Sequence, residues 1–317
     1  MPRVIYLSKK GIRGTAACNA LRGFALVLLR FPGKMPIYFG NKRKGEGIKI
    51  MNIIFNCYPE GKKKALTMSY DDGNAADRRL VEIFNKYGIR GTFHLNSARF
   101  DKEGSLTTAE IPVLFANHEV SCHTYNHPFP NTMPREGLIY EICQDRKMLE
   151  SAAGYPVRGM SYPYGEYNAG VISLFRSLGM EYSRTTRATG GFGLPEDFMQ
   201  WHPTCHHRAE LMSKLETFKN PPRRIPNLML FYVWGHSFEF NNDNNWDLIE
   251  NFCREASGLE DVWYATNIEI VDYISALRAL RFGIERTTVY NPSAIPVWFT
   301  ADGKVVKAEP GQTLKLS

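Results

Sequence analysis

The sequence predicts an α/β protein built as a distorted, incompletely closed (β/α)7-type barrel with a small C-terminal β appendage. From Ala65 onward, apolar runs of strand length alternate with amphipathic segments of helical length. Repeated βα units of this size indicate a parallel sheet covered by helices. After Ile284 the pattern changes to short alternating polar and apolar runs, which are typical of small antiparallel strands.

Each barrel element is predicted from its own local signal. The strands expected from short apolar runs are 65–71, 91–95, 119–122, 159–162, 180–185, 227–234 and 262–264. The helices expected from apolar residues at helical spacing are 75–87, 108–117, 134–153, 169–178, 247–256 and 268–280. Gly88 and Gly154 follow two of these helices, as C-cap glycines do. The strand over 227–234 is the most continuously apolar, which is expected of a strand buried on both faces.

Two regions depart from this alternation. Residues 186–224 contain several glycines and prolines and are predicted to form a long irregular loop at the mouth of the barrel. In the tail, Ala301-Asp302-Gly303 is a hairpin signal between two strand-like runs. We therefore expect a barrel domain over 51–283 and a small β extension over 284–317.

Positive charge is concentrated at the start of the chain. The 317 residues carry a formal net charge of +7, and residues 1–50 alone carry +10, so the remaining residues carry −3. A basic terminal segment before a mildly acidic body does not favour a nucleic-acid partner, because the charge forms no stripe on a folded face.

The basic leader over 1–50 has three interpretations. Its apolar stretch, 23–29, is too short to span a bilayer, so no integral membrane segment is expected. It could be a signal peptide or an Arg-rich targeting peptide, although no small-residue cleavage site follows the apolar stretch. We favour a disordered segment or a start that is not native, because Met51 lies shortly before the first clear strand. The protein is then expected in the cytoplasm, and it would be secreted if the leader acts as a signal.

The six cysteines are widely spaced and include no CxxC pair. In a chain of this length, such cysteines are expected to be reduced and mostly buried thiols rather than a disulfide framework.

Candidate chemical residues lie near the ends of predicted strands. Asp71 and Asp72 end the first strand, and His123 and His127 follow the third. An acidic pair followed by glycine would by itself be interpreted as a turn. Two imidazoles at i and i+4 on a helical turn converge on one side, and with one carboxylate they could form a three-ligand metal site with an open position. The carboxyl ends of the strands are also where barrels of this class place their active sites.

Five short motifs together resemble those of the NodB-type polysaccharide deacetylases, carbohydrate esterase family 4, over about residues 65–280. They are Ser69-Tyr70-Asp71-Asp72-Gly73, His123-Thr124-Tyr125-Asn126-His127, Ser161-Tyr162-Pro163-Tyr164-Gly165, Asp197-Phe198-Met199-Gln200-Trp201 and Leu230-Phe231-Tyr232-Val233-Trp234-Gly235-His236. The resemblance implies the NodB homology fold and a metal-dependent deacetylase.

The resemblance also implies a role for particular residues. Asp71 is implied as the general base and His236 as the general acid that protonates the leaving group. The backbone N–H of Tyr164 is implied as a donor to the oxyanion. The residues implied at the substrate groove are Tyr162, Pro163, Trp201, His202 and Trp234.

The same resemblance implies that Asp72, His123 and His127 bind one divalent ion. Zinc is the first expectation for such a donor set, with cobalt, nickel or manganese as alternatives. A second cluster, His202, Cys205, His206 and His207, matches the spacing of no closed zinc framework. We therefore expect His202 or His206 at the mouth of the site in preference to a second zinc site.

Two positions depart from the family pattern. Ser161 stands where the family has an arginine that orients the base, and Gln200 stands where it has a second acid. Arg158 is the residue that we expect to replace the arginine, because a cation beside Asp71 would hold it ionised. The other candidates are Arg184, Arg187 and Arg208.

These features predict a hydrolase that removes acetyl groups from an N-acetylated or O-acetylated saccharide. One alternative is a hydrolase of small amides on the same fold. Another is a carbohydrate-binding protein that has lost catalysis, which the departures at Ser161 and Gln200 suggest. The retained base, metal ligands and acid count against this last alternative.

Overall fold

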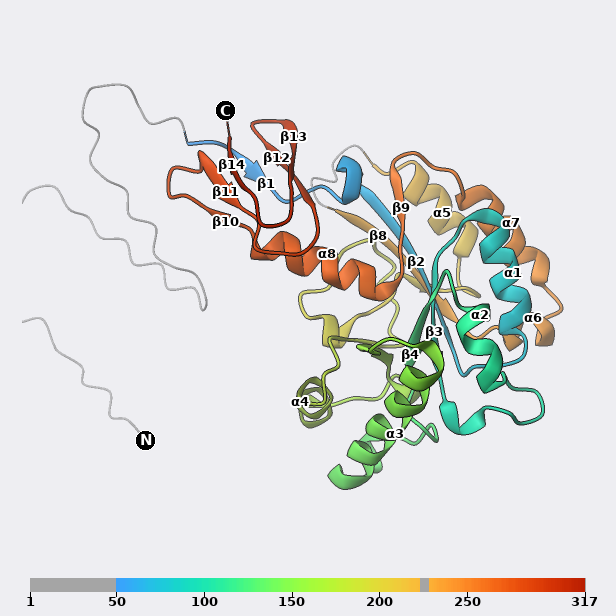
Figure 1. Cartoon of the computed structure of the whole chain (residues 1–317). Helices are drawn as coiled ribbons and strands as arrows, with labels where there is room; N and C mark the ends of the chain where they lie inside the picture. Colours follow the sequence, from blue (N-terminus) through green and yellow to red (C-terminus); the bar gives the residue numbers. More distant parts are fainter. Residues whose placement is uncertain (1–49, 223–227, 317) are drawn as a thin grey trace, which may run out of the picture. The chain divides into compact units, whose positions relative to one another are not determined.

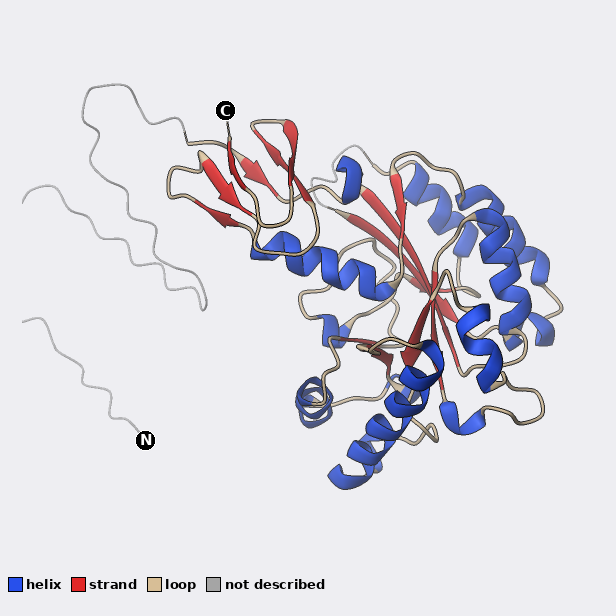
Figure 2. Ribbon diagram, in the orientation of Figure 1, coloured by secondary structure: helices blue, strands red, loops and turns tan. Residues whose placement is uncertain are grey.

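A sheet of eight parallel strands forms the centre of the fold (Figures 1 and 2). Its strands are β2 (Lys64–Asp71), β3 (Gly91–Leu95), β4 (Glu119–Cys122), β5 (Gly159–Ser161), β6 (Tyr182–Arg184), β7 (Cys205–His206), β8 (Met229–Gly235) and β9 (Val262–Tyr264). They lie in the order β6-β5-β4-β3-β2-β8-β7, and β9 pairs with the first residues of β2. β2 is therefore the central strand, and each of its residues is buried.

The computed structural model describes residues 50–222 and 228–316. These residues belong to one compact unit, Ile48–Ser317. The predictions about the basic leader, and the cellular location that depends on them, fall on residues outside these ranges. Among the described residues, no helix combines the length and apolar character that crossing a membrane requires.

Eight helices are described around the sheet (Figure 2). They are α1 (Asp77–Tyr87), α2 (Ile111–Leu114), α3 (Arg135–Ala153), α4 (Ala169–Ser177), α5 (Leu211–Lys219), α6 (Phe238–Asn242), α7 (Trp246–Ala256) and α8 (Asn267–Ala279). α1, α5 and α7 lie together on one side of the sheet, and α8 lies on the other (Figure 1). Gly88 ends α1 in the left-handed conformation, with a φ of +66°, as its C-cap role requires.

The apolar run of β8 is explained by burial on both faces. Met229, Phe231 and Val233 pack into one hydrophobic cluster with α1 and α7. The alternate residues, Leu230 and Tyr232, pack into a second cluster with α8. Because successive side chains of a strand point to opposite faces, a strand between two apolar layers has no polar position.

The barrel is incompletely closed, as predicted. Its two edge strands, β6 and β7, meet only through the segment before β7, where Trp201 forms an isolated bridge with Arg184. The backbone N–H of Trp201 donates to the carbonyl of Ser183 over 3.0 Å, and the N–H of Thr185 donates to the carbonyl of Trp201 over 3.0 Å. The prediction of a wholly irregular loop over 186–224 was wrong, because this region contains β7 and α5.

The tail forms the predicted small β appendage, visible in red in Figure 1. Its two antiparallel sheets are β1-β12-β13 and β10-β11-β14, from β1 (Ile53–Ile54), β10 (Arg281–Phe282), β11 (Thr288–Tyr290), β12 (Val297–Ala301), β13 (Lys304–Ala308) and β14 (Thr313–Lys315). Asp302 and Gly303 make the predicted hairpin turn, with φ values of +45° and +83°. The appendage thus includes strands from before and after the barrel.

The expectation of reduced cysteines is confirmed for the described residues. Cys57, Cys122, Cys205 and Cys253 are free and buried, and Cys143 is free and exposed.

Candidate active site

The two neighbouring carboxylates at the end of β2 have different surroundings. Asp71 is the last residue of β2, and its side chain is only 3% exposed. Asp72 lies outside the strand in the left-handed conformation, with a φ of +82°, and its side chain is 15% exposed. The sharp turn between them directs one carboxylate into the barrel interior and leaves the other at the mouth.

Left-handed backbone recurs around this mouth. Asp72, Thr124, His127 and Tyr164 all have positive φ values, of +82°, +66°, +58° and +59°. Such conformations are costly for residues other than glycine and collect at functional sites. The prediction that His123 and His127 share a helical turn was wrong: they converge through a loop that Thr124 and His127 bend, and this loop brings their rings to 4.7 Å.

Asp72, His123 and His127 form a compact group of potential metal ligands. The Nε2 atoms of the two imidazoles are 3.1 Å apart, and they lie 3.6 Å and 3.7 Å from Oδ1 of Asp72. Nδ1 of His123 lies 2.9 Å from the carbonyl oxygen of Ser161 and so carries the proton that it donates there. The Nε2 atom of His123 is then unprotonated and available as a ligand, which is how metal-binding histidines are usually held. The donor set therefore fits a divalent ion.

Asp71 is held by Arg184 and Ser161. The guanidinium of Arg184 donates to Oδ2 of Asp71, and the Ser161 hydroxyl donates to Oδ1 over 3.1 Å. Burial by itself would raise the pKa of Asp71, but the charge of Arg184 holds this pKa well below its ordinary value. Asp71 therefore stays ionised at neutral pH.

The prediction that Arg158 orients the base was wrong. Arg158 instead donates to Glu181 over 3.0 Å and to Asp272 over 2.7 Å. It precedes β5, so it lies at the amino end of the parallel sheet, whereas Asp71 lies at the carboxyl end. Arg184, one of the alternatives, ends β6 and is fully buried. The sequence could have distinguished the two arginines, because Arg158 precedes a predicted strand whereas Arg184 lies near the end of one.

His236 follows β8, the neighbour of β2, and its imidazole faces Glu239. Nδ1 of His236 is 3.4 Å from Oε2 of Glu239, and the His236 backbone N–H donates to the same oxygen over 3.0 Å. Burial would lower the pKa of His236, but the bond to Glu239 and the charges of Asp71 and Asp72 outweigh it and raise that pKa. At a given pH, a larger fraction of His236 is thus protonated than of a free histidine. Sequence reasoning missed Glu239, which lies three residues further along the chain in the first turn of α6.

A second group with metal-ligand geometry contains His206, His236 and Glu239. Nε2 of His206 lies 3.1 Å from Glu239, but Nδ1 of His206 accepts the backbone N–H of Arg208 over 3.1 Å. The Nε2 atom of His206 therefore carries a proton. The Arg208 guanidinium also lies 2.7 Å from the other oxygen of Glu239. A protonated Nε2 has no lone pair to offer a metal, and Glu239 already pairs with Arg208. This group therefore does not fit a divalent ion.

Asp145 on α3 holds the backbone of His123, one of the potential metal ligands, and links it to Ser97. Its Oδ1 accepts the N–H and the hydroxyl of Ser97 over 2.9 Å and 2.6 Å, and its Oδ2 accepts the N–H of His123 over 3.1 Å. Burial raises the pKa of Asp145 to about 7, although these bonds oppose the rise. Sequence reasoning missed Asp145; an acid on the buried face of the predicted helix is the signal that could have indicated it.

The prediction that Trp201 and Tyr162 contact substrate was wrong. Trp201 is 1% exposed and packs edge-to-face on Tyr182 and Tyr232, because the backbone bridge that closes the barrel turns its ring into the core. Tyr162 is also 1% exposed, and its hydroxyl donates to the carbonyl of Met199. Pro163 is buried beside it.

The other two predicted groove residues have different surroundings. Trp234 is partly buried, and its ring covers the guanidinium of Arg184 at 4.3 Å, so it supports the cation that holds Asp71. His202 bonds to the hydroxyl of Thr185 and lines a separate surface pocket with Arg187 and Asp197.

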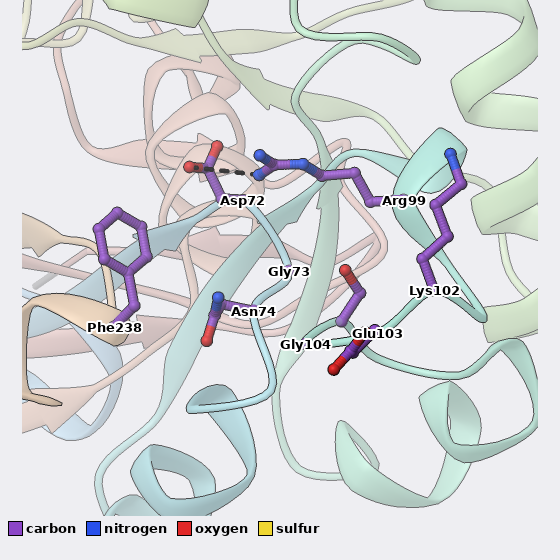
Figure 3. Close-up of a pocket in the computed structure, with 9 residues that line it drawn as sticks. Asp72, Gly73, Asn74, Arg99, Lys102, Glu103, Gly104 and Phe238 are labelled. Atoms are coloured by element: carbon purple, nitrogen blue, oxygen red, sulfur yellow. Dashed lines mark ion pairs between the residues drawn. The ribbon is translucent and has the colours of Figure 1, made fainter.

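A cavity of about 580 Å³ opens beside Asp72 (Figure 3). Arg99 points from one wall toward Asp72, with Nη1 3.6 Å from Oδ2, and the ring of Phe238 stands at the opposite side. The remaining polar lining includes Asn74, Lys102 and Glu103. The mouth of the barrel is therefore open to solutes next to the candidate metal ligands.

Comparisons with known proteins agree with the motif resemblance, which is confirmed. Residues 59–183 match the family model described as polysaccharide deacetylase. Chitin deacetylase 1 of Cryptococcus neoformans is 24% identical over 159 residues, which cover 50% of this chain and 33% of that protein. Chitooligosaccharide deacetylase of Azorhizobium caulinodans is 24% identical over 121 residues, which cover 37% of this chain and 56% of that protein. This chain thus spans less than two thirds of either relative.

The fold is also similar to a solved structure. A Mycobacterium smegmatis protein that was assigned to the polysaccharide deacetylases superposes with a TM-score of 0.53 and 17% identity, covering 70% of this chain and 93% of that one. At this identity the likeness supports the fold alone.

Proposed function

We propose that this chain, whose residues 59–183 match the polysaccharide deacetylase family, is a metal-dependent hydrolase that removes acetyl groups from an N-acetylated or O-acetylated saccharide. The observation that carries the proposal is the order of chemical groups along one sheet edge. His123 follows β4, Asp71 ends β2 with Asp72 directly after it, and His236 follows β8. A base thus lies between a potential metal site on one side and an acid on the other.

The proposed first step uses Asp71 as the base. A divalent ion held by Asp72, His123 and His127 would polarise the acetyl carbonyl and make an attacking water more acidic. Asp71 takes the proton of that water, and Arg184 and Ser161 hold its carboxylate in position and ionised. The backbone N–H of Tyr164, in the turn beside His127, is proposed to donate to the developing oxyanion.

The proposed second step uses His236 as the acid. Its raised pKa keeps the imidazolium available, and Glu239 fixes the ring through Nδ1. The opposite nitrogen then delivers its proton to the departing sugar nitrogen or oxygen. Asp71 and His236 are held in opposite protonation states, which is the arrangement that acid–base catalysis needs.

The position of Arg184 weakens the alternative of a binding protein that has lost catalysis. That alternative was suggested by two departures, Ser161 at the place of the family arginine and Gln200 at the place of the second acid. Here Arg184 supplies the cation from β6, and the Ser161 hydroxyl bonds to Asp71 as well. The departure at Ser161 therefore changes which residue holds the base and does not remove its support.

Acetate release tests the proposed function. The zinc-loaded protein is expected to release acetate from oligomers of N-acetylglucosamine, and Asp71→Asn is expected to lower the rate by about 1,000-fold or more, as for loss of an essential catalytic group. Asp272→Asn, which alters a carboxylate at the other end of the sheet, serves as the control. Unchanged turnover in Asp71→Asn, or release from small amides but from no saccharide, would overturn the proposal.

A further inference from the structure

The loop between His123 and His127 is hydrogen-bonded to α3 at its centre. Glu141 of α3 is 4% exposed, and both of its carboxylate oxygens accept bonds from Asn126: Oε2 from the backbone N–H over 2.7 Å and Oε1 from the side-chain amide over 2.8 Å. The backbone carbonyl of Glu141 also accepts the N–H of Tyr125 over 3.2 Å. These three bonds, here called the Glu141 clamp, hold the stretch of chain that joins two potential metal ligands.

The clamp lies next to the ligand that has the least other support. At the start of the loop, the amide of Asn96 donates to the carbonyl of His123 over 2.6 Å, and Asp145 accepts the His123 N–H over 3.1 Å. At its end, the clamped Asn126 directly precedes His127. The Nε2 atoms of the two imidazoles lie 3.1 Å apart, and both must turn a lone pair toward the same ion for the site to bind it. Both ends of the loop therefore need a fixed position.

The clamped residues lie between two strained positions. Thr124 and His127 have left-handed backbones, with φ values of +66° and +58°. Such conformations cost free energy in residues other than glycine and persist only where the surrounding structure enforces them. Tyr125 and Asn126, which Glu141 bonds, are the two residues between these positions. The clamp thus restrains both left-handed turns and, with them, the direction of the His127 ring.

A carboxylate is suited to this place for a chemical reason. Burying one costs free energy unless its oxygens are hydrogen-bonded or paired. Among the described residues Glu141 forms no ion pair, and its side-chain bonds all go to Asn126. Two N–H donors of one residue require two acceptor oxygens, which an ionised carboxylate has and an amide side chain does not. The cost of burying Glu141 is therefore offset by bonds to the ligand loop.

We infer that Glu141 is a positioning residue: through Asn126 it fixes His127 and so raises the affinity of the candidate site for a divalent ion. Groups that orient metal ligands from outside the site typically change metal affinity by about 10- to 100-fold. The inference rests on the proposed function, because metal binding by Asp72, His123 and His127 is part of it. It adds a residue of α3 that the five sequence motifs do not contain.

Zinc binding to the metal-stripped protein tests the clamp without turnover. In competition with a chromophoric chelator, Glu141→Ala is expected to raise the Kd for zinc about 10- to 100-fold. Glu141→Gln keeps one acceptor oxygen, and Asn126→Ala keeps the backbone bond, so each is expected to raise this Kd by about 3- to 10-fold. The double variant Glu141→Ala with Asn126→Ala should match Glu141→Ala alone, because the Asn126 side chain acts only through Glu141.

Glu150→Gln is the matched control on the same helix. Glu150 bonds to Arg146 and to the backbone N–H of Val157, not to the ligand loop, so this change should leave the Kd for zinc unmoved. Urea unfolding of each metal-stripped variant shows that it is folded at the temperature of the titration. Asn126 is exposed, so Asn126→Ala tests the clamp even if Glu141→Ala does not fold. A Kd equal to that of wild type in the folded clamp variants would overturn the inference.

Acetate release at increasing zinc gives the second readout. Glu141→Ala should regain most of the wild-type kcat once zinc exceeds its raised Kd, because all three proposed ligands remain, whereas His127→Ala should not. A deficit of Glu141→Ala that persists at saturating zinc would overturn the positioning role. An unchanged Kd in the clamp variants of an active enzyme would overturn the inference and leave the proposed function standing. Zinc binding that depends on Glu141, without acetate release by wild type, would support the inference and overturn the proposed function.

Discussion

The guanidinium of Arg184 and the carboxylate of Asp71 form a buried ion pair at the carboxyl edge of the sheet. Their strands, β6 and β2, are separated in the sheet by β5, β4 and β3. The pair therefore crosses the interior of the curved sheet, where a low dielectric strengthens the interaction. The ring of Trp234 covers the guanidinium from β8, and Ser161 of β5 donates to the carboxylate, so four strands contribute to the position of Asp71.

Removing this cation is expected to impair catalysis and shift its pH dependence. Arg184→Lys keeps the charge and loses the planar fork, so we expect kcat/KM to fall about 10- to 100-fold. Arg184→Met leaves the buried Asp71 charge unpaired, which raises the pKa of Asp71 and moves the acidic limb of the pH–rate profile to higher pH. It also lowers the free energy of unfolding by about 3–5 kcal/mol. Rates from pH 4 to 9 and urea unfolding measure these effects.

Arg158→Met is the matched control for Arg184. Arg158 pairs with Glu181 and Asp272, away from Asp71, so this change should leave the pH–rate profile unmoved. A loss of activity in Arg158→Met equal to that in Arg184→Met would contradict the assignment of Arg184.

We expect a divalent metal ion to bind to Asp72, His123 and His127. We do not expect one at the second group, which contains His206, His236 and Glu239. Zinc at 100 times its Kd should stabilise the wild-type protein by about 2.7 kcal/mol, which is seen as a rise in Tm. His127→Ala should abolish this rise, because it removes one of the proposed ligands. His206→Ala should keep it, because His206 holds a proton against Glu239. Thermal unfolding with and without zinc, together with metal content by mass spectrometry, measures both effects. A rise in Tm that is kept in His127→Ala and lost in His206→Ala would place the metal at the second group instead.

The alkaline limb of the pH–rate profile is expected to depend on Glu239. Glu239 raises the pKa of His236, so Glu239→Gln should lower that pKa. Since the acid must be protonated, activity should then be lost at lower pH than in the wild-type enzyme. Glu250→Gln, at a half-buried carboxylate on α7 that pairs with Lys86, is the control. An alkaline limb that stays in place in Glu239→Gln would argue against His236 as the acid.

Asp77 is expected to make the metal-free protein less stable as pH rises. It is 1% exposed in α1, and burial raises its pKa to about 8, above the ordinary value of 3.8. The folded state therefore favours the neutral carboxyl, and stability is highest below about pH 4 and declines as pH rises toward 8. Asp77→Asn should be close to wild type in stability at pH 4 and more stable than wild type at pH 8, by about 5 kcal/mol for a pKa shift of roughly four units.

Chelator-treated Asp77→Asn and wild type can be compared by urea unfolding at both pH values. Asp247→Asn, at an exposed residue in the first turn of α7, should show no gain at pH 8. A pH-independent difference for Asp77→Asn would mean that the carboxyl is not neutral in the folded state.

The local pattern of apolar and turn residues predicted most strands and helices of the barrel, and it placed the motif residues at strand ends. The predicted bounds of β3, β4 and β9 agree with the structure, because apolar periodicity and flanking turn residues act within a few residues. The main error in the barrel was α5, whose sequence lies within the region of glycines and prolines. The positions of Asp71 and His236 followed from strand ends in the same way, since parallel strands bring their carboxyl ends to one edge.

The sequence by itself therefore determined that the carboxylates and histidines at the strand ends reach the mouth of the barrel, and the tertiary structure decided which side chains contact them. The choice of Arg184 over Arg158 and the burial of Trp201 in the core both depend on contacts between residues far apart in the chain. These contacts depend on the curvature of the sheet and on the narrow junction between β6 and β7. Neither is encoded in a short window, because curvature arises from the packing of all the strands and helices together.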